Sequence, residues 1–458
     1  MKTVFIPAYH GFVARAIFNS DALGDLKKRA DVRVVIFGPS SKKDFFEKLY
    51  GGPNVVVEGF DVEDIIRNPR NKFWYRLAFL LQNSQYVIDQ RKERLWHHRT
   101  VTGYLNYWML NSLAWVLSRL GFVRWLYRWA DYRYSPKNVF MPFIEQYKPD
   151  LIFSSDVFCE QDALLLRSAK ISGIPTLGMV RSWDNTTTKG ILRIFPDRLL
   201  VNSQAIADEI VKLHSYQRYL IKVVGLPQFD KWVSGPTLSR EEFMKKLNIP
   251  TDRRIIMFTP AGANLSTVDG ELCDILKQAI NAGEIPANLH VIISNHPAHP
   301  ADLSKFTPDD HFTIEHLGKL FGVVSYREVE MTPNDNDNLR NFIYYSDIIM
   351  YIANSMGLDA LIYDKPTIIV SFDGYGHVPY IKSIRRFNNE DCLHNLVLTG
   401  CTKVARSKQE WLQQINDYLK DSTVDVAGRI FARERYMEPM DGQSGHRIAG
   451  EVLKELKV

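Results

Sequence analysis

Cysteine is scarce in this chain of 458 residues, which contains only four: Cys159, Cys273, Cys392 and Cys401. They lie far apart and form no CxxC or cysteine–histidine spacing, so the sequence predicts neither a disulfide framework nor a zinc site. This absence indicates a reducing compartment, and we expect a cytoplasmic protein. The apolar run in residues 1–7 is too short for a signal peptide and instead predicts a buried strand.

Long uninterrupted apolar segments are also missing. The best candidate, around residues 101–120, is interrupted by Asn111 and Arg119, whereas a membrane-spanning helix needs about 20 predominantly apolar residues. Signs of extensive disorder are missing too, because 45% hydrophobic and 24% charged residues are ordinary for a globular protein. A chain of this length predicts about two domains of roughly 200 residues each.

Apolar strands and helical segments alternate in both halves of the chain. In the first half, strands are expected up to Pro7 and at 32–37, 151–153, 176–179, 198–201 and 221–224. In the second half, strands are expected at 255–259, 289–294, 348–351 and 367–370. This alternation is typical of parallel sheets covered by helices, so the predicted fold class is α/β with two Rossmann-like domains.

The expected domain organisation follows from these two halves. Residues 1–228 form an N-terminal domain with a helical insertion at about 65–145, residues 229–245 form a linker, and residues 246–440 form the C-terminal domain. The last segment, 441–458, is expected to contain a helix that packs back on the N-terminal domain. Doubly wound sheets bind ligands outside the carboxyl ends of their strands, so a cleft between the two domains is the expected site.

The segment after the strand at 348–351 has the pattern of a phosphate site. A polar turn, Asn354-Ser355, opens a helix through Met356 and Gly357, and a helix N-terminus offers unpaired N–H groups to a phosphate. Asp359 lies about one helical turn after Ser355, where a carboxylate can accept hydrogen bonds from ribose hydroxyls. An equally open interpretation is that Ser355 only caps the helix and Asp359 is a solvated charge.

Two other strand ends contribute to the predicted donor site. His296-Pro297 follows the strand at 289–294, and Thr259 ends the strand at 255–259. An imidazolium at His296 could pair with a donor phosphate or protonate the leaving nucleotide. Taken alone, a histidine at a strand end more often bonds to a backbone carbonyl.

The corresponding loops of the first half contain candidate bases and acceptor ligands. The candidate bases are Asp184, which lies in the segment Arg181–Gly190, and the competing residues Asp156 and His10. The residues expected to hold acceptor or phosphate oxygens are Arg15, Arg181, Thr187 and Lys189. An Asp-Asn turn with a local hydrogen bond is as well supported for Asp184 as the role of base.

The order of these motifs resembles GT-B transferases of the CDP-glycerol glycerophosphotransferase and bacterial polysialyltransferase type, which build surface polymers. The motifs are Trp183 to Gly190, Gly225 to Asp230, His296-Pro297, Ser355 with Asp359, Lys365-Pro366, and Asp441 to Ser444. The resemblance implies that His296 and Asn354-Ser355 bind the donor phosphates. It also implies a base at Asp184, which stands where the family has a histidine after the tryptophan.

A basic, aromatic segment distinguishes the insertion. Residues 67–137 contain 13 lysines and arginines against 3 aspartates and glutamates, although the whole chain carries a net charge of only +5. Six of the nine tryptophans lie there: Trp74, Trp96, Trp108, Trp115, Trp125 and Trp129. Arginine and tryptophan at helical spacing suit peripheral contact with an anionic membrane. A helical hairpin with the tryptophans in its core and the arginines in solvent is at least as well supported.

The sequence therefore predicts a glycosyltransferase that moves a sugar or sugar-like group from a nucleotide-activated donor to a hydroxyl of a glycan or lipid-linked glycan. We expect an inverting displacement, for which one base and stabilisation of the phosphates suffice. We expect no metal or other cofactor, since Asp335-Asn336-Asp337 fits a helix start better than a metal site, with Asp337 as the N-cap. The alternatives are a two-domain nucleotide-sugar epimerase and a non-catalytic protein that binds nucleic acid or membrane.

Overall fold

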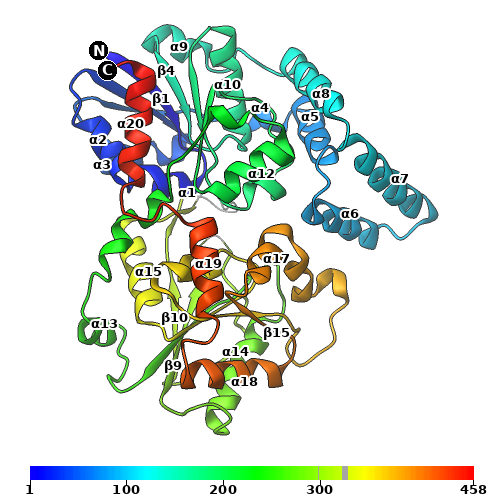
Figure 1. The fold of residues 1–458 in the computed structure, drawn as a ribbon, viewed down its shortest axis with the longest axis vertical. Helices are drawn as coiled ribbons and strands as arrows, with labels where there is room; N and C mark the ends of the chain where they lie inside the picture. Colours follow the sequence, from blue (N-terminus) through cyan, green and yellow to red (C-terminus); the bar gives the residue numbers. More distant parts are fainter. Residues whose placement is uncertain (298, 322–328) are drawn as a thin grey trace. The chain divides into compact units, whose positions relative to one another are not determined.

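The structure is a computed structural model that describes residues 1–297, 299–321 and 329–458. The chain divides into two units. Unit 1 comprises Met1–Lys231 and Tyr436–Val458, and unit 2 comprises Trp232–Arg435. Figure 1 shows that each unit has a central sheet with helices on its faces. The predicted α/β class with two Rossmann-like domains is confirmed.

Within the described residues, the sheet of unit 1 has seven parallel strands in the order β3-β2-β1-β4-β5-β6-β7. The strands are β1 (Lys2–Pro7), β2 (Val32–Gly38), β3 (Val55–Gly59), β4 (Leu151–Ser154), β5 (Thr176–Met179), β6 (Arg198–Val201) and β7 (Ile221–Val223). Because β2 and β3 lie on one side of β1 and the later strands on the other, the winding direction reverses between β1 and β4. Such a switch point is where doubly wound sheets bind ligands.

Helices cover both faces of this sheet, so its strands are apolar on both faces. Alternate residues of β1 enter opposite cores, Val4 and Ile6 on one face and Phe5 on the other. The covering helices are α2 (Asp21–Lys27), α3 (Lys43–Tyr50), α9 (Met141–Tyr147), α10 (Glu160–Ile171), α12 (Gln204–His214) and α20 (Ser444–Leu456). The last of these packs against α2, and its Ile448 and Val452 lie in the same core as Val4.

The segment between β1 and β2 is not one continuous helix. It contains α1 (Gly11–Val13), a π-helical turn (Ala14–Phe18) and then α2. The Ser20 hydroxyl accepts a hydrogen bond from the backbone N–H of Ala22 at 3.3 Å and caps α2. An apolar periodicity that continues through both pieces conceals this break.

The insertion of unit 1 is helical, as expected. It contains α4 (Glu63–Arg67), α5 (Pro69–Leu80), α6 (Gln85–His97), α7 (Val101–Leu117) and α8 (Gly121–Tyr134). Figure 1 shows α6 and α7 lying away from the sheet of unit 1. In the described part of the chain, no helix is both long enough and apolar enough to cross a membrane.

Unit 2 repeats the parallel topology. Its main sheet, as far as the structure describes it, has six strands in the order β10-β9-β8-β13-β14-β15. The strands are β8 (Arg254–Thr259), β9 (Leu289–Asn295), β10 (Phe312–His316), β13 (Ile348–Tyr351), β14 (Thr367–Val370) and β15 (Lys403–Ala405), and a small antiparallel pair adds β11 (Lys319–Leu320) and β12 (Val329–Glu330). Here the winding direction reverses between β8 and β13.

The described residues of unit 2 form seven α-helices. They are α13 (Arg240–Lys246), α14 (Asp269–Asn281), α15 (Pro333–Tyr345), α16 (Met356–Asp359), α17 (Asp391–Leu398), α18 (Lys408–Lys420) and α19 (Val426–Tyr436), the last of which ends one residue into unit 1. In α15 the expected N-cap, Asp337, is wrong. Thr332 is the N-cap, and Asp335 accepts hydrogen bonds from its N–H at 2.9 Å and its hydroxyl at 2.7 Å. This capping box uses the first carboxylate of the Asp-Asn-Asp motif.

Candidate functional site

Three predicted donor-site residues of unit 2 follow neighbouring strands. Strands β9, β8 and β13 lie side by side, and Tyr351 at the end of β13 is in register with Thr259 at the end of β8. His296 comes directly after β9, and Asn354 comes three residues after β13. Their strands therefore end at one edge of the sheet, at the switch point of unit 2.

The Asn354 side chain builds the turn after β13. Its amide donates to the Thr259 carbonyl at 3.3 Å and to the Thr259 hydroxyl at 3.2 Å, and its oxygen accepts from the Met356 N–H at 3.0 Å. The preceding Ala353 has a left-handed φ of 48°, which is uncommon for a residue other than glycine. Asn354 thus ties β13 to β8 and holds a strained turn at the switch point.

Ser355 is placed where the sequence predicts, directly before α16, but its side chain makes no capping hydrogen bond. Its carbonyl accepts from the N–H groups of Leu358 and Asp359, at 2.9 and 3.0 Å. The capping role considered for its hydroxyl is taken by Asn354. Helix α16 has four residues and runs directly into a 3-10 helix, Ala360–Tyr363, so the helix expected after Ser355 is present but short.

The other donor residues predicted on α16 are buried. A Cβ atom on Gly357 would lie 2.1 Å from the Tyr351 hydroxyl oxygen, so packing of the turn against β13 requires glycine there. Met356 is 8% exposed and Asp359 is 4% exposed. The interpretation of Asp359 as a solvated charge is therefore wrong.

His296 lies in a tightly held loop. Its ring stacks on His299 with centroids 5.5 Å apart, and the Asn264 amide donates to His299 Nδ1 at 2.8 Å. Burial, with a smaller contribution from His299, lowers the pKa of His296 to about 4. This shift disfavours the protonated ring when no phosphate pairs with it, and the imidazolium expected beside a donor phosphate stays a prediction. Pro297 follows, half-buried.

In unit 1, the structure brings two of the predicted residues together at the switch point. Asp156 follows β4, and one of its carboxylate oxygens accepts from Arg181 Nε at 2.9 Å. The other accepts from the Asn185 amide at 3.1 Å and from the Phe158 N–H at 3.2 Å. Asp156 is thus a buried hub that ties the loop after β4 to the loop after β5.

Asp184 makes a separate set of contacts. It precedes α11 (Asn185–Thr188), accepts hydrogen bonds from the hydroxyl of Ser182 and, at 3.1 Å, from that of Thr188, and is half-buried. The predicted acceptor ligand Thr187 instead donates to the Asp184 carbonyl at 3.2 Å. Lys189 follows the helix and is half-buried. The Asp184 carboxylate makes no capping hydrogen bond to the backbone, and the two hydroxyls leave it oriented and partly accessible.

His10 and Arg15 follow β1. His10 Nδ1 accepts from the Phe12 N–H at 3.3 Å, so a neutral His10 carries its proton on Nε2 and is a hydrogen-bond donor there rather than a base. Arg15 lies in the π-helical turn with its guanidinium carbon 5.9 Å from the centre of the Phe229 ring.

Comparison with known proteins identifies the fold. No family model matches the chain, and no curated protein matches it in sequence. Among solved structures, the chain resembles Staphylococcus aureus MnaA with UDP (TM-score 0.54, 12% identity, covering 100% of this chain and 97% of that one). It also resembles the UDP-GlcNAc 2-epimerase of Neisseria meningitidis bound to UDP-GlcNAc (TM-score 0.53, 11% identity, covering 99% of this chain and 100% of that one). A third similar structure is the wall teichoic acid polymerase TagF (TM-score 0.51, 11% identity, covering 100% of this chain and 89% of that one).

The fold is of the GT-B type. At these identities the likeness shows the fold alone.

Two features of this GT-B chain were missed by sequence reasoning. In unit 1, Asp162 accepts from the Ser154 hydroxyl at 2.8 Å and from the Asp156 N–H at 3.0 Å. Burial, and then the charge of Asp156, raise its pKa well above the ordinary value.

The second missed feature of the GT-B chain is a cation beside β14. The buried Asp373, three residues after β14, pairs with Arg385 Nε at 3.1 Å and accepts from the Ser383 hydroxyl at 2.6 Å. Arg385 thereby stands near the carboxyl end of the strand next to β13. The only signal in the sequence is an arginine pair in a polar loop after an apolar strand.

Proposed function

We propose that this protein transfers a sugar or sugar-like group from a nucleotide-activated donor to a hydroxyl of a glycan or lipid-linked glycan. Unit 2 binds the donor through Thr259, His296 and the Asn354-Ser355 turn, and unit 1 presents the acceptor near Asp184. The observation that carries this proposal is the row of polar groups at the ends of β9, β8 and β13, at the switch point of a GT-B sheet.

Neutral donors at this edge suit a diphosphate. The half-buried imidazole of His296, whose pKa is lowered to about 4, is uncharged at neutral pH and can donate one N–H to a phosphate oxygen. A bound phosphate favours the protonated ring, so the pKa of His296 rises when the donor binds. His296 then offers charge neutralisation to the leaving nucleotide, where negative charge develops during displacement.

Asp184 is the base that the contacts favour. Asp156 is buried and engaged by Arg181 and Asn185, and the Nε2 of a neutral His10 is a donor. Asp184 is half-buried and is oriented by two hydroxyls. A base must reach the proton that it removes, so the partly accessible carboxylate is the best candidate for an inverting, one-step displacement.

The donor half of the proposal is tested by calorimetry with UDP, GDP, CDP, CMP and TDP. We expect one of these to bind, and His296→Ala and Ser355→Ala to weaken it. His394→Ala serves as the matched control because His394 is exposed on α17. Binding that neither site variant changes would remove the donor site as described.

An epimerase is the second candidate, because two of the similar solved structures are UDP-GlcNAc 2-epimerases or carry bound UDP. Such an enzyme needs the donor site but no acceptor. Incubation of the protein with each UDP-sugar alone separates the two candidates. Appearance of the epimerised UDP-sugar without any acceptor would replace the transferase proposal.

Metal independence is part of the proposal and is tested separately. We expect transfer to continue in excess EDTA, since His296, protonated when a phosphate binds, supplies positive charge to the donor phosphates. Loss of transfer in EDTA and recovery with a divalent cation would contradict this part alone.

A further inference from the structure

The outer surface of the helical insertion is apolar and exposed. Trp108 and Trp115 on α7 and Trp125 and Trp129 on α8 are between 52% and 67% exposed. The interpretation of the tryptophans as the core of a hairpin is therefore wrong for these four. Only Trp74, which is packed in a small cluster with Ala78 and Tyr127, fits it.

Helix α7 has two apolar faces. Its inner face lies against α6, where Arg91 NH1 donates to Asn111 Oδ1 at 2.9 Å. The opposite face exposes large apolar side chains at helical spacing: Val101, Leu105, Trp108, Met109, Trp115 and Val116. A helix that is apolar all round is normally buried in a protein core or in a membrane, so in this chain one face is left uncovered.

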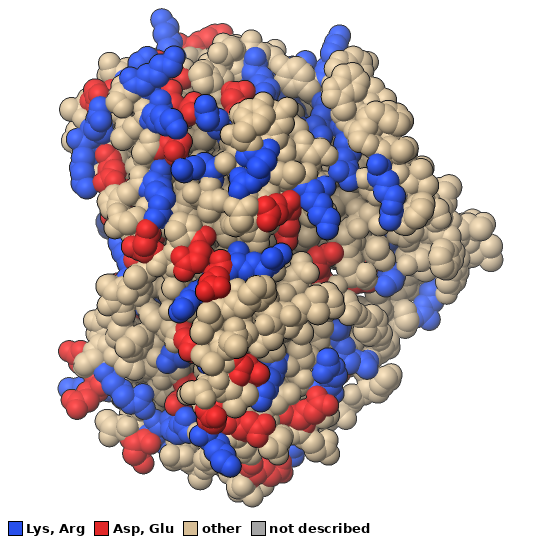
Figure 2. Space-filling view, viewed as in Figure 1, with Lys and Arg blue, Asp and Glu red and all other residues tan. Residues whose placement is uncertain are grey.

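Helix α8 continues this surface. Phe122, Trp125, Leu126 and Trp129 follow at positions i, i+3, i+4 and i+7, and all four are exposed. We call the exposed apolar side chains of α7 and α8 the outer face. In Figure 2 the region over these helices is mostly tan with scattered blue, and red is nearly absent.

The charges around the outer face are of one sign. In residues 67–137, all of which the structure describes, Asp89 and Glu93 are half-buried and Asp131 is fully buried, so no carboxylate of this range is exposed. The exposed cations of the same range are Arg67, Arg70, Lys72, Arg76, Arg94, Arg99, Arg119 and Arg133. The surface therefore complements a negatively charged partner.

A cationic hollow adjoins the outer face at the end of α8. A shallow pocket of about 530 Å³ is lined by Arg70, Arg133 and Lys137 together with Tyr134. The Tyr134 ring lies 6.4 Å from the ring of Trp129, centroid to centroid, so the hollow and the outer face are continuous. Three cations around one opening suit a phosphate group.

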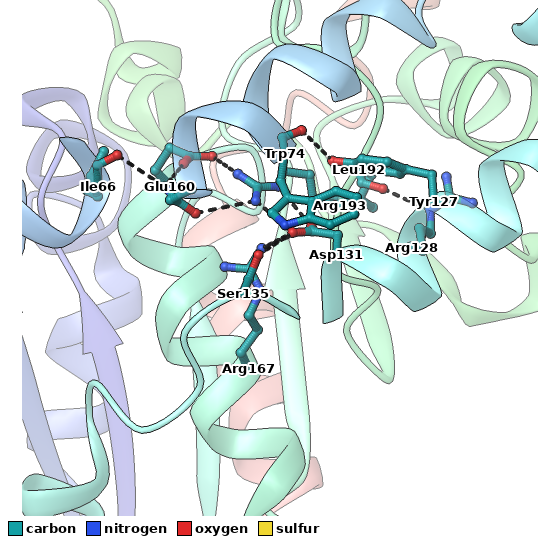
Figure 3. Close-up of polar contacts among 11 residues, drawn as sticks. Ile66, Trp74, Tyr127, Arg128, Asp131, Ser135, Glu160, Arg167, Leu192 and Arg193 are labelled. Atoms are coloured by element: carbon teal, nitrogen blue, oxygen red, sulfur yellow. Dashed lines mark hydrogen bonds and ion pairs between the residues drawn. The ribbon is translucent and has the colours of Figure 1, made fainter. Parts of the chain in front are cut away.

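The insertion is firmly anchored, so the outer face is not a loosely packed core. Asp131 of α8 pairs with Arg167 of α10 at 2.9 Å and with Arg193 at 2.8 Å (Figure 3). Arg193 also pairs with Glu160 of α10, and Asn71 of α5 donates to Glu160 at 2.6 Å. Asp131 and Arg167 are fully buried. Two arginines and two carboxylates thus fix α5 and α8 to the Rossmann-like core.

We propose that the outer face and its cationic hollow dock on the surface of an anionic lipid bilayer. The 17 residues of α7 span about 25 Å, and the helix lies in the interface with its exposed indoles at the acyl boundary. The guanidinium carbon of Arg119, 4.0 Å from the centre of the Trp115 ring, then meets the headgroups. The hollow takes a lipid phosphate.

Lipid fits these observations better than the other occupants. Nucleic acid is gripped by cations and stacked aromatic rings, whereas half of the exposed side chains named on α7 are the aliphatic residues Val101, Leu105 and Val116. A second copy of the chain would bring two sets of cations together without an exposed carboxylate on either side. The membrane proposal is independent of the transferase proposal.

The test is flotation of the full-length protein with two kinds of vesicle. One kind contains phosphatidylcholine alone, and the other contains equal parts of phosphatidylcholine and phosphatidylglycerol. We expect the protein to float with the anionic vesicles, to float poorly with the neutral ones, and to be released by salt, which screens exposed charges.

Two variants separate the apolar and charged contributions. Trp108→Ser, Trp125→Ser and Trp129→Ser together should abolish flotation, whereas Tyr219→Ser, Leu398→Ser and Phe431→Ser, at residues 52% to 76% exposed elsewhere, should leave it unchanged. Replacement of Arg70, Arg133 and Lys137 by Gln should weaken binding about fivefold for each cation. The matched control replaces Lys48, Lys420 and Lys457, which are exposed outside the insertion.

Three results would overturn the proposal. The first is no flotation with anionic vesicles, and the second is flotation that the triple serine variant leaves intact. The third is a different occupant: a dimer in solution that the triple serine variant splits, or salt-sensitive capture of single-stranded nucleic acid that the same variant loses. Each variant should stay soluble and give a circular dichroism spectrum that matches the wild type. A loss of flotation then reflects the changed surface rather than misfolding.

Discussion

The carboxyl edges of the two sheets occupy the same place in the same topology but differ in charge. In unit 1, the edge holds the ion pair between Asp156 and Arg181, and the Asp156 N–H donates to Asp162, whose pKa is raised well above its ordinary value. In unit 2, Thr259 and Asn354 carry no charge, and the pKa of His296 is lowered to about 4. The shared fold supplies the location, and the loop residues decide the chemistry.

The largest expected effect tests whether the charged edge is catalytic. Asp184→Asn should lower the transfer rate about 10²- to 10⁴-fold, the usual contribution of a general base, with little change in donor binding. Steady-state assay with a labelled donor measures this. Asp208→Asn, at an exposed position on α12, is the matched control, and a rate within twofold of the wild type for Asp184→Asn would exclude this residue as the base.

The next effect concerns the ion pair of unit 1. Asp156→Ala leaves the Arg181 guanidinium, only 12% exposed, without its carboxylate, and should destabilise unit 1 by about 3–5 kcal/mol. Hydrogen exchange of amides in β4 and α10 reports this loss. Amides of β8 and β13 provide the internal control, because unit 2 should keep its protection. Equal losses in both units would mean that the pair has no local role.

The uncharged edge should respond to pH through His296. Burial lowers the pKa of His296 from the ordinary 6.5 to about 4. A bound diphosphate should raise this pKa. Donor binding then takes up a proton, so affinity should rise as pH falls below the pKa of the complex, by up to about tenfold per pH unit. Calorimetry between pH 5 and pH 8 measures the slope. In His296→Gln the slope should disappear; its persistence would assign the proton to another group.

The smallest expected effect is a loss of stability when Asn354 is replaced. Asn354→Ala removes the cap on Met356 and the bridge to Thr259, which should cost unit 2 about 1 kcal/mol. Amide exchange in α16 and β13 measures this cost. Asn288→Ala, at an exposed position, should have no such effect. An unchanged Asn354→Ala variant would show that the left-handed Ala353 turn is held by the rest of the chain.

The strands missed from the sequence are informative about what could be predicted. In the two main sheets every interior strand was expected, whereas the edge strands β3, β10 and β15 were not, and neither was the small pair of β11 and β12. Interior strands are buried on both faces and form continuous apolar runs, such as Ile348 to Tyr351. Edge strands such as Lys403–Ala405 are short and partly exposed, so their composition does not differ from that of a loop.

The candidate site was predictable in position but less so in detail. The sequence places Asp156 and Arg181 after separate strands, 25 residues apart, and only the parallel pairing of β4 with β5 brings them to 2.9 Å. Burial, which the sequence does not reveal, lowers the pKa of His296, and its expected charge beside a donor phosphate stays a prediction. Asn354 was expected at a phosphate, and its bonds to Thr259 depend on β8 and β13 being neighbours.

The amino-acid sequence alone determined that two α/β sheets form and where the carboxyl ends of their interior strands lie, since apolar runs and helical periods are local properties of the chain. Tertiary structure decided which polar groups pair at those edges and which apolar side chains stay uncovered. Trp108 and Trp125 have the spacing of core residues, and only the arrangement of α6, α7 and α8 leaves them in solvent. The physical reason is that burial and pairing depend on distant neighbours, which a local pattern does not contain.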